Sequence, residues 1–199
     1  LMASIAVLEA RRSELSERSQ TALDLLSGDL ERFNRLVADL LEISGYDAGA
    51  ASLDLSEVQV AQFLTVMAGS AAVTLQLPPG AEHMVINADK RRLARVIANL
   101  LDNATRYGGG PTSIAVEGDD THLRISVEDS GPGVPEVERT AIFERFSRGS
   151  AGGRRGGGSG LGLSIASALV TAHGGTLTPS ASALGGLTWT LRLPLLTAS

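Results

Sequence analysis

Two asparagines at helical spacing are the first residues of this chain whose types could do chemistry. Asn99 and Asn103 lie in the stretch DKRRLARVIANLLDNATRYGGG, residues 89–110, and on a helix they would stack on one side. An asparagine oxygen can coordinate a hard cation such as Mg2+ without adding negative charge beside a polyphosphate. The pair therefore indicates a metal site near a phosphorylated ligand, with Arg106 able to contact phosphate. A surface helix that carries two asparagines by chance is the alternative.

An acidic residue followed by two glycines forms a second candidate site. Asp129 leaves an apolar strand and precedes Gly131 and Gly133 in the segment EDSGPG. The glycines allow a sharp turn and the close approach of a flat ligand. A carboxylate at this point can accept a hydrogen bond from the N6 amino group of adenine, whereas it would repel the O6 of guanine. We therefore predict an adenine site, with a simple acidic turn as the alternative.

A glycine-rich segment that runs into a helix is the third candidate. The sequence GGRRGGGSGLGLSIA, residues 152–166, becomes an apolar helix at Leu161. Glycines before a helix N-terminus present backbone N–H groups to phosphates. The run Gly149 to Gly160 predicts a mobile lid that becomes ordered on ligand binding. It is not a Walker A loop, because no lysine follows the glycines, and no βαβ unit surrounds it.

The helix expected to carry the two asparagines has an apolar opposite side. Six apolar residues recur at the spacing of one helical face, and such a stripe must pack against a core. They are Leu93, Val96, Ile97, Leu100, Leu101 and Ala104. This helix is therefore expected to organise the fold around it.

The chain from Leu53 onward alternates between strand and helix patterns. Strands are expected at residues 53–60, 73–77, 84–86, 112–117, 123–127, 176–181 and 187–193, and further helices at 61–67 and 161–172. We expect strands that are neighbours in sequence to pair as hairpins, with the helices clustered together. This arrangement is an α+β fold, a two-layer α/β sandwich, and not a doubly wound parallel sheet.

Residues 1–52 show a different, purely helical pattern. A short stripe runs from Met2 to Leu15, and a longer one with alternating spacings of three and four residues follows it: Leu23, Leu26, Leu30, Phe33, Val37 and Leu40. That alternation is typical of helices packed in a bundle. We expect a helical hairpin that ends near Gly45, with the linker DAGAAS after it. A second copy would complete a four-helix bundle; packing of the helices on their own chain is the alternative.

Composition and charge exclude several classes of protein. The chain of 199 residues is 43% hydrophobic and 20% charged, which is typical of a globular protein. It contains no cysteine, so disulfides and cysteine-based metal sites are excluded. The net charge of -5 and the dispersed basic residues argue against nucleic-acid binding. The sequence contains no apolar run of the roughly 20 residues that a membrane span needs. We therefore expect a cytoplasmic location and no membrane contact by this chain.

Four motifs, taken in order, resemble the N, G1, F and G2 boxes of bacterial sensor histidine kinases. They are NLLDNATRY (99–107), DSGPG (129–133), FERF (143–146) and GSGLGL (158–163) with HGG (173–175). Their spacing is also similar to that of the family. The resemblance implies that residues 53–199 form an ATP-binding catalytic domain of the Bergerat fold, and that residues 1–52 are a truncated dimerisation hairpin.

The resemblance also implies roles for individual residues. Asn103 would bind Mg2+ with Asn99 assisting, Arg106 would contact phosphate, and Tyr107 would lie beside ATP. Asp129, with Gly131 and Gly133, would bind the adenine. The triphosphate would lie against Gly158, Gly160, Leu161, Gly162 and Leu163, and Arg145 or Arg148 would reach the γ-phosphate. His173 is interpreted as a structural residue at a helix end and not as a catalyst.

The chain departs from the family in its histidines. The phosphoacceptor histidine of the family lies on the first bundle helix in a segment like SHELRTPL, and this chain has only His83, His122 and His173. None of the three lies in such a context. We therefore expect the acceptor to be absent from this chain, which would be a fragment of a longer, membrane-anchored protein. A natural protein that has lost the acceptor site is the alternative.

Two functions remain open from the sequence. The first is the kinase core of a two-component system, which transfers the γ-phosphoryl group of ATP to a histidine for relay to an aspartate on a response-regulator receiver domain. It would act as a homodimer through the hairpin. The second is a non-catalytic nucleotide-binding or interaction module, either a degenerate kinase or an ATPase switch of the same fold.

Overall fold

The computed structural model describes residues 7–47, 52–119, 121–147 and 159–196. It divides into two compact units, Leu1–Ala48 and Gly49–Ser199. No helix in these described ranges is both long enough and apolar enough to cross a bilayer.

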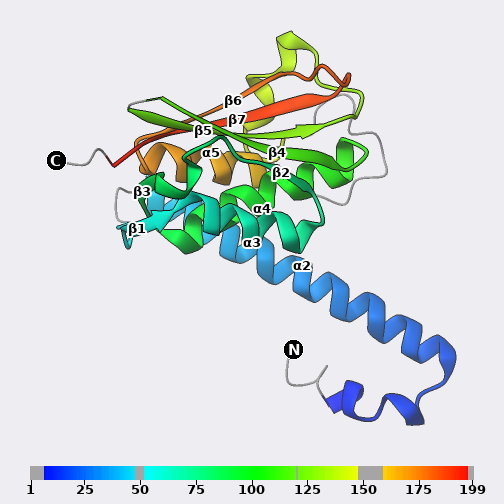
Figure 1. Ribbon diagram of the computed structural model, residues 1–199. Helices are drawn as coiled ribbons and strands as arrows, with labels where there is room; N and C mark the ends of the chain where they lie inside the picture. Colours follow the sequence, from blue (N-terminus) through cyan, green and yellow to red (C-terminus); the bar gives the residue numbers. More distant parts are fainter. Residues whose placement is uncertain (1–6, 48–51, 120, 148–158, 197–199) are drawn as a thin grey trace. The chain divides into compact units, whose positions relative to one another are not determined.

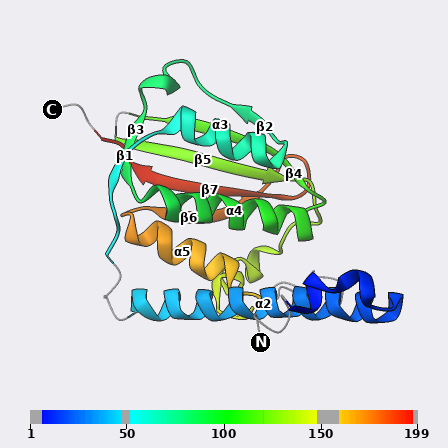
Figure 2. The ribbon, with the colours of Figure 1, turned by 90° about the horizontal axis from the view of Figure 1, so that it is seen from below.

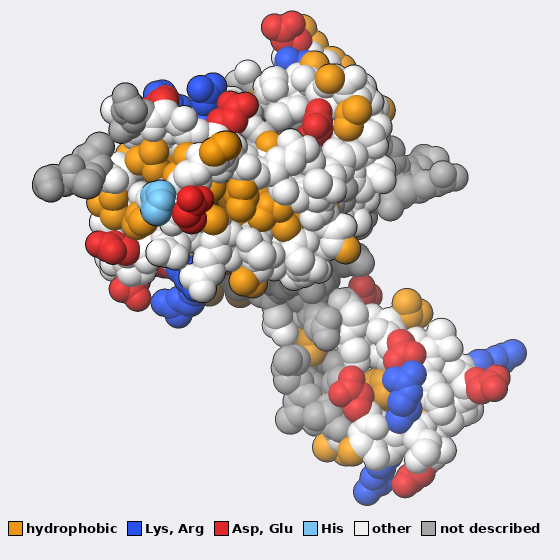
Figure 3. All heavy atoms as spheres, in the orientation of Figure 1, with side chains coloured by type: hydrophobic (Ala, Val, Ile, Leu, Met, Phe, Trp, Pro, Cys, Tyr) orange, Lys and Arg blue, Asp and Glu red, His pale blue; other side chains and the backbone are white. Residues whose placement is uncertain are grey.

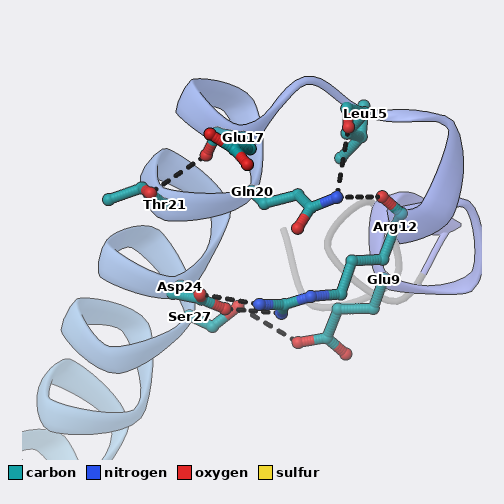
Figure 4. Close-up of polar contacts among 8 residues, drawn as sticks. All are labelled: Glu9, Arg12, Leu15, Glu17, Gln20, Thr21, Asp24 and Ser27. Atoms are coloured by element: carbon teal, nitrogen blue, oxygen red, sulfur yellow. Dashed lines mark hydrogen bonds and ion pairs between the residues drawn. The ribbon is translucent and has the colours of Figure 1, made fainter.

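The first unit consists of a long helix and a short segment that folds back along it. Helix α2 spans Glu17–Asp47, and the 3-10 helix η1, Arg12–Glu14, precedes it. Figure 4 shows the polar contacts between the two: Arg12 donates to both carboxylate oxygens of Asp24, at 2.5 and 2.7 Å. The hydrogen bond from Arg12 is the main cause that lowers the pKa of Asp24. Ser27 also donates to Glu9, at 3.1 Å.

The apolar stripe of α2 is largely uncovered. Leu26, Phe33 and Leu40 are 54%, 60% and 47% exposed, whereas Leu23 is buried. The predicted end of this helix near Gly45 agrees with the structure to within two residues, since α2 ends at Asp47. One glycine in a helix costs only about 1 kcal/mol relative to alanine, so it does not by itself end a long helix.

The second unit is a two-layer sandwich of helices on one face of a mixed sheet. The strand order is β2-β4-β5-β7-β6, with β2 Thr74–Gln76, β4 Pro111–Gly118, β5 His122–Asp129, β7 Leu187–Pro194 and β6 Thr176–Ala181. Helices α3 Val60–Ala71, α4 Lys90–Tyr107 and α5 Gly162–Ala172 lie on one side of it, as Figures 1 and 2 show from two directions. The predicted α+β sandwich is confirmed.

The pairing of the strands agrees only partly with the prediction. The hairpins β4–β5 and β6–β7 form as expected. The prediction that all sequence neighbours pair is wrong for β2 and β3, Val85–Ala88: β2 pairs in parallel with β4, and β3 pairs with β1, Ser56–Gln59. Val60, expected at a strand end, is the first residue of α3. The turn between β2 and β3 separates the two strands into different sheets.

The core lies between the sheet and the helices. Along β5, Leu123, Ile125 and Val127 are buried at alternate positions, and Asp129 takes the next position of the same series. Alternation in a strand sends these side chains to one face. The strand therefore directs the carboxylate of Asp129 into the layer between the sheet and the helices, where it is 3% exposed.

Charged side chains are distributed over the surface. On the face drawn in Figure 3, Lys and Arg side chains stand apart from one another and mostly lie near Asp or Glu. Among the described contacts, Arg12 pairs with Asp24, Arg92 with Asp89, and Arg106 with Asp102.

Candidate functional site

Helix α4 begins at a strong N-cap and buries the predicted stripe. The Asp89 carboxylate accepts hydrogen bonds from the backbone N–H groups of Arg91 and Arg92, at 3.1 and 3.2 Å. Burial would raise the pKa of Asp89, but hydrogen bonds from the Arg92 and Asp54 backbones and the charge of Arg92 outweigh it, and the pKa is lowered. The six apolar residues of the predicted stripe are all buried. This packing fixes the polar side of α4, which carries the asparagines.

The two asparagines differ in their contacts. Asn99 donates through Nδ2 to the backbone carbonyl of Gly162 at 3.1 Å, so it joins α4 to the start of α5. Asn103 is half-buried, and its side-chain amide makes no hydrogen bond with the described residues. The amide of Asn103 is therefore available to a ligand.

Arg106 and Tyr107 lie at the C-terminal end of α4. Arg106 donates through Nε to Asp102, one helical turn earlier, at 2.6 Å. This hydrogen bond is the main cause that raises the pKa of the Arg106 guanidinium. Tyr107 is 36% exposed. Since only Nε of Arg106 is used by Asp102, the outer edge of the guanidinium can still face a phosphate.

Asp129 is held in one orientation by two backbone groups. Its Oδ1 atom accepts hydrogen bonds from Gly131 N–H at 3.0 Å and from Leu187 N–H at 3.1 Å. Its Oδ2 atom has no hydrogen bond from the described residues. A carboxylate with one oxygen fixed and the other available is suited to accept a hydrogen bond from a ligand amino group.

Four glycines allow the backbone to close around this carboxylate. A Cβ atom on Gly108 would clash with the Asp129 side chain. A Cβ atom on Gly186 would clash with both the backbone carbonyl oxygen and the Oδ1 atom of Asp129. A Cβ atom on Gly131 would lie 2.5 Å from the Cα of Gly108. Gly133 has a φ of 70°, a value that favours glycine. The glycine positions therefore pack three chain segments against one carboxylate.

The FERF segment contacts both the sheet and the start of α5. Phe143 ends the 3-10 helix η4, Ala141–Phe143, and lies edge-on to Trp189 with ring centroids 6.0 Å apart. Phe146 donates its N–H to the carbonyl of Gly160 at 3.0 Å. Gly160 has a φ of 70°, and a Cβ atom there would lie 2.8 Å from the Phe146 backbone. Arg145 between them is exposed.

Helix α5 starts directly at the predicted phosphate-binding glycines. Leu161 is its N-cap and is 1% exposed, while Gly162 and Leu163 form its first turn. The first N–H groups of a helix have no partner within the helix and can bind an anion. Arg148, Gly158 and most of the predicted lid lie outside the described residues.

The structure brings some of the predicted site residues into direct contact and leaves Arg106 apart from them. Asn99 is bonded to Gly162, and Asp129 is bonded to Gly131. Arg106 is engaged with Asp102, and no hydrogen bond or ion pair joins it to the other predicted residues.

Sequence reasoning missed Gly108, Gly186 and the N–H of Leu187. All three surround Asp129, yet Gly186 and Leu187 are more than 50 residues away from it in the chain. The pair GG at 185–186 was a visible signal of a turn, but its contact depends on the β5–β7 pairing. Helix periodicity and local motifs carry no information about that pairing.

His173 lies at the other end of α5. It is the C-cap of the helix and is 8% exposed. Its Nε2 atom accepts the N–H of Asp89 at 3.0 Å, and its Nδ1 atom is 2.7 Å from the carbonyl of Leu169. A carbonyl only accepts, so Nδ1 carries the proton and Nε2 is the acceptor.

Comparisons with known proteins identify the class to which this site belongs. The family model described as histidine kinase-, DNA gyrase B- and HSP90-like ATPases matches residues 88–197, which is more than half of the chain. The chain belongs to this family. It therefore contains an ATP-binding domain of this type, with the site elements of α4, β5 and α5 inside the matched range.

Individual proteins similar to this chain include a histidine-protein kinase. The signal transduction histidine-protein kinase AfsQ2 of Streptomyces coelicolor is 40% identical over 176 residues, which cover 88% of this chain and 33% of AfsQ2. The ATP binding domain of PrrB from Mycobacterium tuberculosis is 30% identical, with a TM-score of 0.58 over 71% of this chain and 98% of that domain. Full-length ShkA in complex with AMPPNP is 26% identical, with a TM-score of 0.73 over 93% of this chain and 40% of ShkA. The chain thus spans about one third of the length of the curated relative AfsQ2.

Proposed function

We propose that residues 53–199 bind MgATP as the kinase core of a two-component sensor, and that residues 1–52 belong to its dimerisation hairpin. The γ-phosphoryl group would pass to a histidine side chain and then to an aspartate on a response-regulator receiver domain. The 40% identity with a histidine-protein kinase supports this proposal. ATP would supply the phosphoryl group, and the residues of this chain would position the ATP.

The arrangement of Asp129 is the observation that carries the proposal. Its Oδ1 atom is fixed by two backbone N–H groups, and its Oδ2 atom is open to a ligand. In our proposal Oδ2 accepts a hydrogen bond from the N6 amino group of adenine. Guanine carries an oxygen at this position, and two acceptors repel each other.

The metal and phosphate roles go to residues of α4 and the start of α5. The open amide of Asn103 suits a Mg2+ ion. Mg2+ prefers oxygen ligands, and it is usually bound by a few protein oxygens together with oxygens of the substrate phosphates. Asn99 would assist and would keep Gly162 in place through its hydrogen bond. Gly160, Leu161, Gly162 and Leu163 would present backbone groups to the triphosphate, with Gly158 before them.

The arginines would neutralise the charge of the triphosphate. Arg106 would contact phosphate through its outer edge while Asp102 holds its Nε. Arg145 or Arg148 would reach the γ-phosphate. Phosphoryl transfer depends on this kind of positioning and charge neutralisation more than on covalent chemistry by the protein.

Calorimetry on the wild-type chain and two variants tests the nucleotide site. We expect Mg2+-dependent ATP binding, weaker GTP binding, and a loss of about ten- to a hundredfold in ATP affinity for Asp129→Asn, since a charge-assisted hydrogen bond contributes about 1.5–3 kcal/mol. Asp29→Asn, the same change at an exposed position of α2, serves as the control and should bind ATP normally. Equal affinities for ATP and GTP would overturn the adenine assignment.

A further inference from the structure

Helices α4 and α5 are joined by hydrogen bonds at two distant points. At one point, Asn99 Nδ2 donates to the carbonyl of Gly162 at 3.1 Å. At the other, the Asp89 N–H donates to His173 Nε2 at 3.0 Å. The first bond lies at the start of α5 and the second at its end, whereas along α4 the order is reversed. The two helices are therefore antiparallel, and each bond marks one end of their contact.

The spacing of the two bonds matches along both helices. Asp89 and Asn99 are ten positions apart, which is about 15 Å of helix, and Gly162 and His173 are eleven positions apart, which is about 16.5 Å. A shift of α5 along α4 by one residue would move every group by about 1.5 Å. Such a shift would lengthen or bend both bonds at once. The pair of bonds thus favours the observed register between the helices.

His173 is built to accept the Asp89 N–H and nothing else at Nε2. Its Nδ1–H donates to Leu169 in its own helix at 2.7 Å, which fixes both the ring and the tautomer. Asp89 is 3% exposed. Its N–H precedes the first turn of α4, so without His173 it would be a buried donor without a partner.

We propose that His173 is a positioning residue for nucleotide binding. It sets the register that brings the first turn of α5, with Gly162, against Asn99 of α4. It acts through Asp89 and does not touch the nucleotide. This inference rests on the proposed function, because the register matters for affinity only if α5 binds the triphosphate and α4 binds its metal.

Three variants separate positioning from simple packing. His173→Phe keeps a ring of similar size but removes the acceptor for Asp89. His173→Gln can place an amide oxygen near the position of Nε2 and is the conservative variant. His83→Phe is the matched control, because the side chain of His83 is 85% exposed and lies in the turn between β2 and β3.

Affinities for MgAMPPNP and for adenosine are the first readout. We expect His173→Phe to bind MgAMPPNP about fivefold more weakly, a typical size for coupling through a residue that does not touch the ligand. Adenosine affinity should stay within about twofold, because Asp129 is not displaced. His173→Gln and His83→Phe should bind both ligands as the wild-type chain does. If His173→Phe binds MgAMPPNP normally, or loses both ligands equally, the proposal is overturned.

Amide hydrogen exchange is the second readout and needs no nucleotide. The Ile165 N–H, bonded to the Leu161 carbonyl at 2.9 Å, reports on the first turn of α5. Its exchange should accelerate in His173→Phe and not in His173→Gln. Unchanged exchange there would also overturn the inference. If the wild-type chain binds no MgAMPPNP, the proposed function fails, and the exchange result still decides whether His173 holds the register.

Discussion

Leu187 donates its backbone N–H to the Oδ1 atom of Asp129 at 3.1 Å, although 58 positions separate the two residues. The bond continues the antiparallel pairing of β5 with β7, in which Glu128 lies opposite Thr188. The orientation of this carboxylate therefore depends on the register of the central sheet. A change that disturbs the strands at this end should alter nucleotide binding and stability together.

Gly108 provides a direct test of the packing around Asp129. It follows α4 with a φ of -100°, which other residues can also adopt, so the cost of a substitution is steric. Because a Cβ atom there would clash with the Asp129 side chain, Gly108→Ala should lower the free energy of unfolding by about 1–3 kcal/mol and weaken ATP binding. Urea unfolding and calorimetry measure the two effects.

Gly69→Ala is the matched control for this substitution. Gly69 lies in helix α3, and a Cβ atom there would meet nothing within 4 Å. Removing a helical glycine should stabilise the domain by about 0.5–1 kcal/mol. If Gly108→Ala unfolded like the wild-type chain, the close packing of Gly108 on Asp129 would be wrong.

Local pattern was sufficient to predict the elements that carry the site. The stripe of α4 was predicted residue by residue, because burial of one helical face imposes a 3.6-residue period on the sequence. The hairpins β4–β5 and β6–β7 were predictable because short connections join them. The role of Asp89 as N-cap follows the same kind of local rule, since its carboxylate bonds N–H groups two and three residues ahead.

Contacts between distant segments could not be predicted in this way. The parallel pairing of β2 with β4 and the bond from Leu187 to Asp129 depend on how the whole sheet assembles. Arg106 could not be assigned from the sequence for a different reason. Its partner Asp102 is only four residues away, but a phosphate would compete with this carboxylate for the same guanidinium, and local pattern does not decide between them. His173 was interpreted as structural, and its bond to Asp89 spans 84 positions.

The turn between β4 and β5 should show an unusually acidic carboxyl group. The backbone N–H of Thr121, its hydroxyl and the N–H of His122 all donate to Asp119, and they lower its pKa from the ordinary 3.8 to about 2. A pKa that is lower in the folded chain stabilises the fold above about pH 3.8, and this contribution is lost as the pH falls to about 2. An NMR titration of the Asp119 carboxyl measures the value directly.

The pH dependence of unfolding gives a second measurement of the same effect. Asp119→Asn cannot titrate, so the stability difference between it and the wild-type chain should shrink as the pH falls from about 4 to about 2. A carboxyl pKa of 3.8 in the folded chain would contradict the three hydrogen bonds to Asp119.

The uncovered stripe of α2 predicts a homodimer. Phe33 is 60% exposed and Leu41 is 68% exposed, and such side chains on one helix favour burial against a second copy. Phe33→Asp would place a charge in the interface and should dissociate the dimer in sedimentation experiments. Gly28→Asp introduces the same charge on the opposite side of α2, where a Cβ atom meets nothing within 4 Å, and should leave the dimer intact. A wild-type chain that sediments as a monomer at high concentration would argue against the bundle.

The chain should phosphorylate a histidine that is supplied to it. Its three histidines do not lie in an acceptor context: His83 is in a short 3-10 helix, His122 opens β5, and His173 is buried. We therefore expect no self-labelling with radioactive ATP and Mg2+, and slow labelling of a separate dimerisation hairpin from a full-length sensor kinase. The reaction should be slow because no covalent linker holds the supplied hairpin at a high effective concentration beside the kinase core.

Three substitutions in the chain then test the residues assigned to transfer. Asn103→Ala should abolish labelling of the hairpin, because it removes the open amide proposed to bind the metal. Asn87→Ala, at an exposed position of β3, is the control and should have no effect. His173→Gln should leave transfer largely intact, since it preserves an acceptor for Asp89. Acid-labile phosphate on His83, His122 or His173 would show that the acceptor lies in this chain. A hairpin that is never labelled although ATP binds would instead favour a nucleotide-binding module without kinase activity.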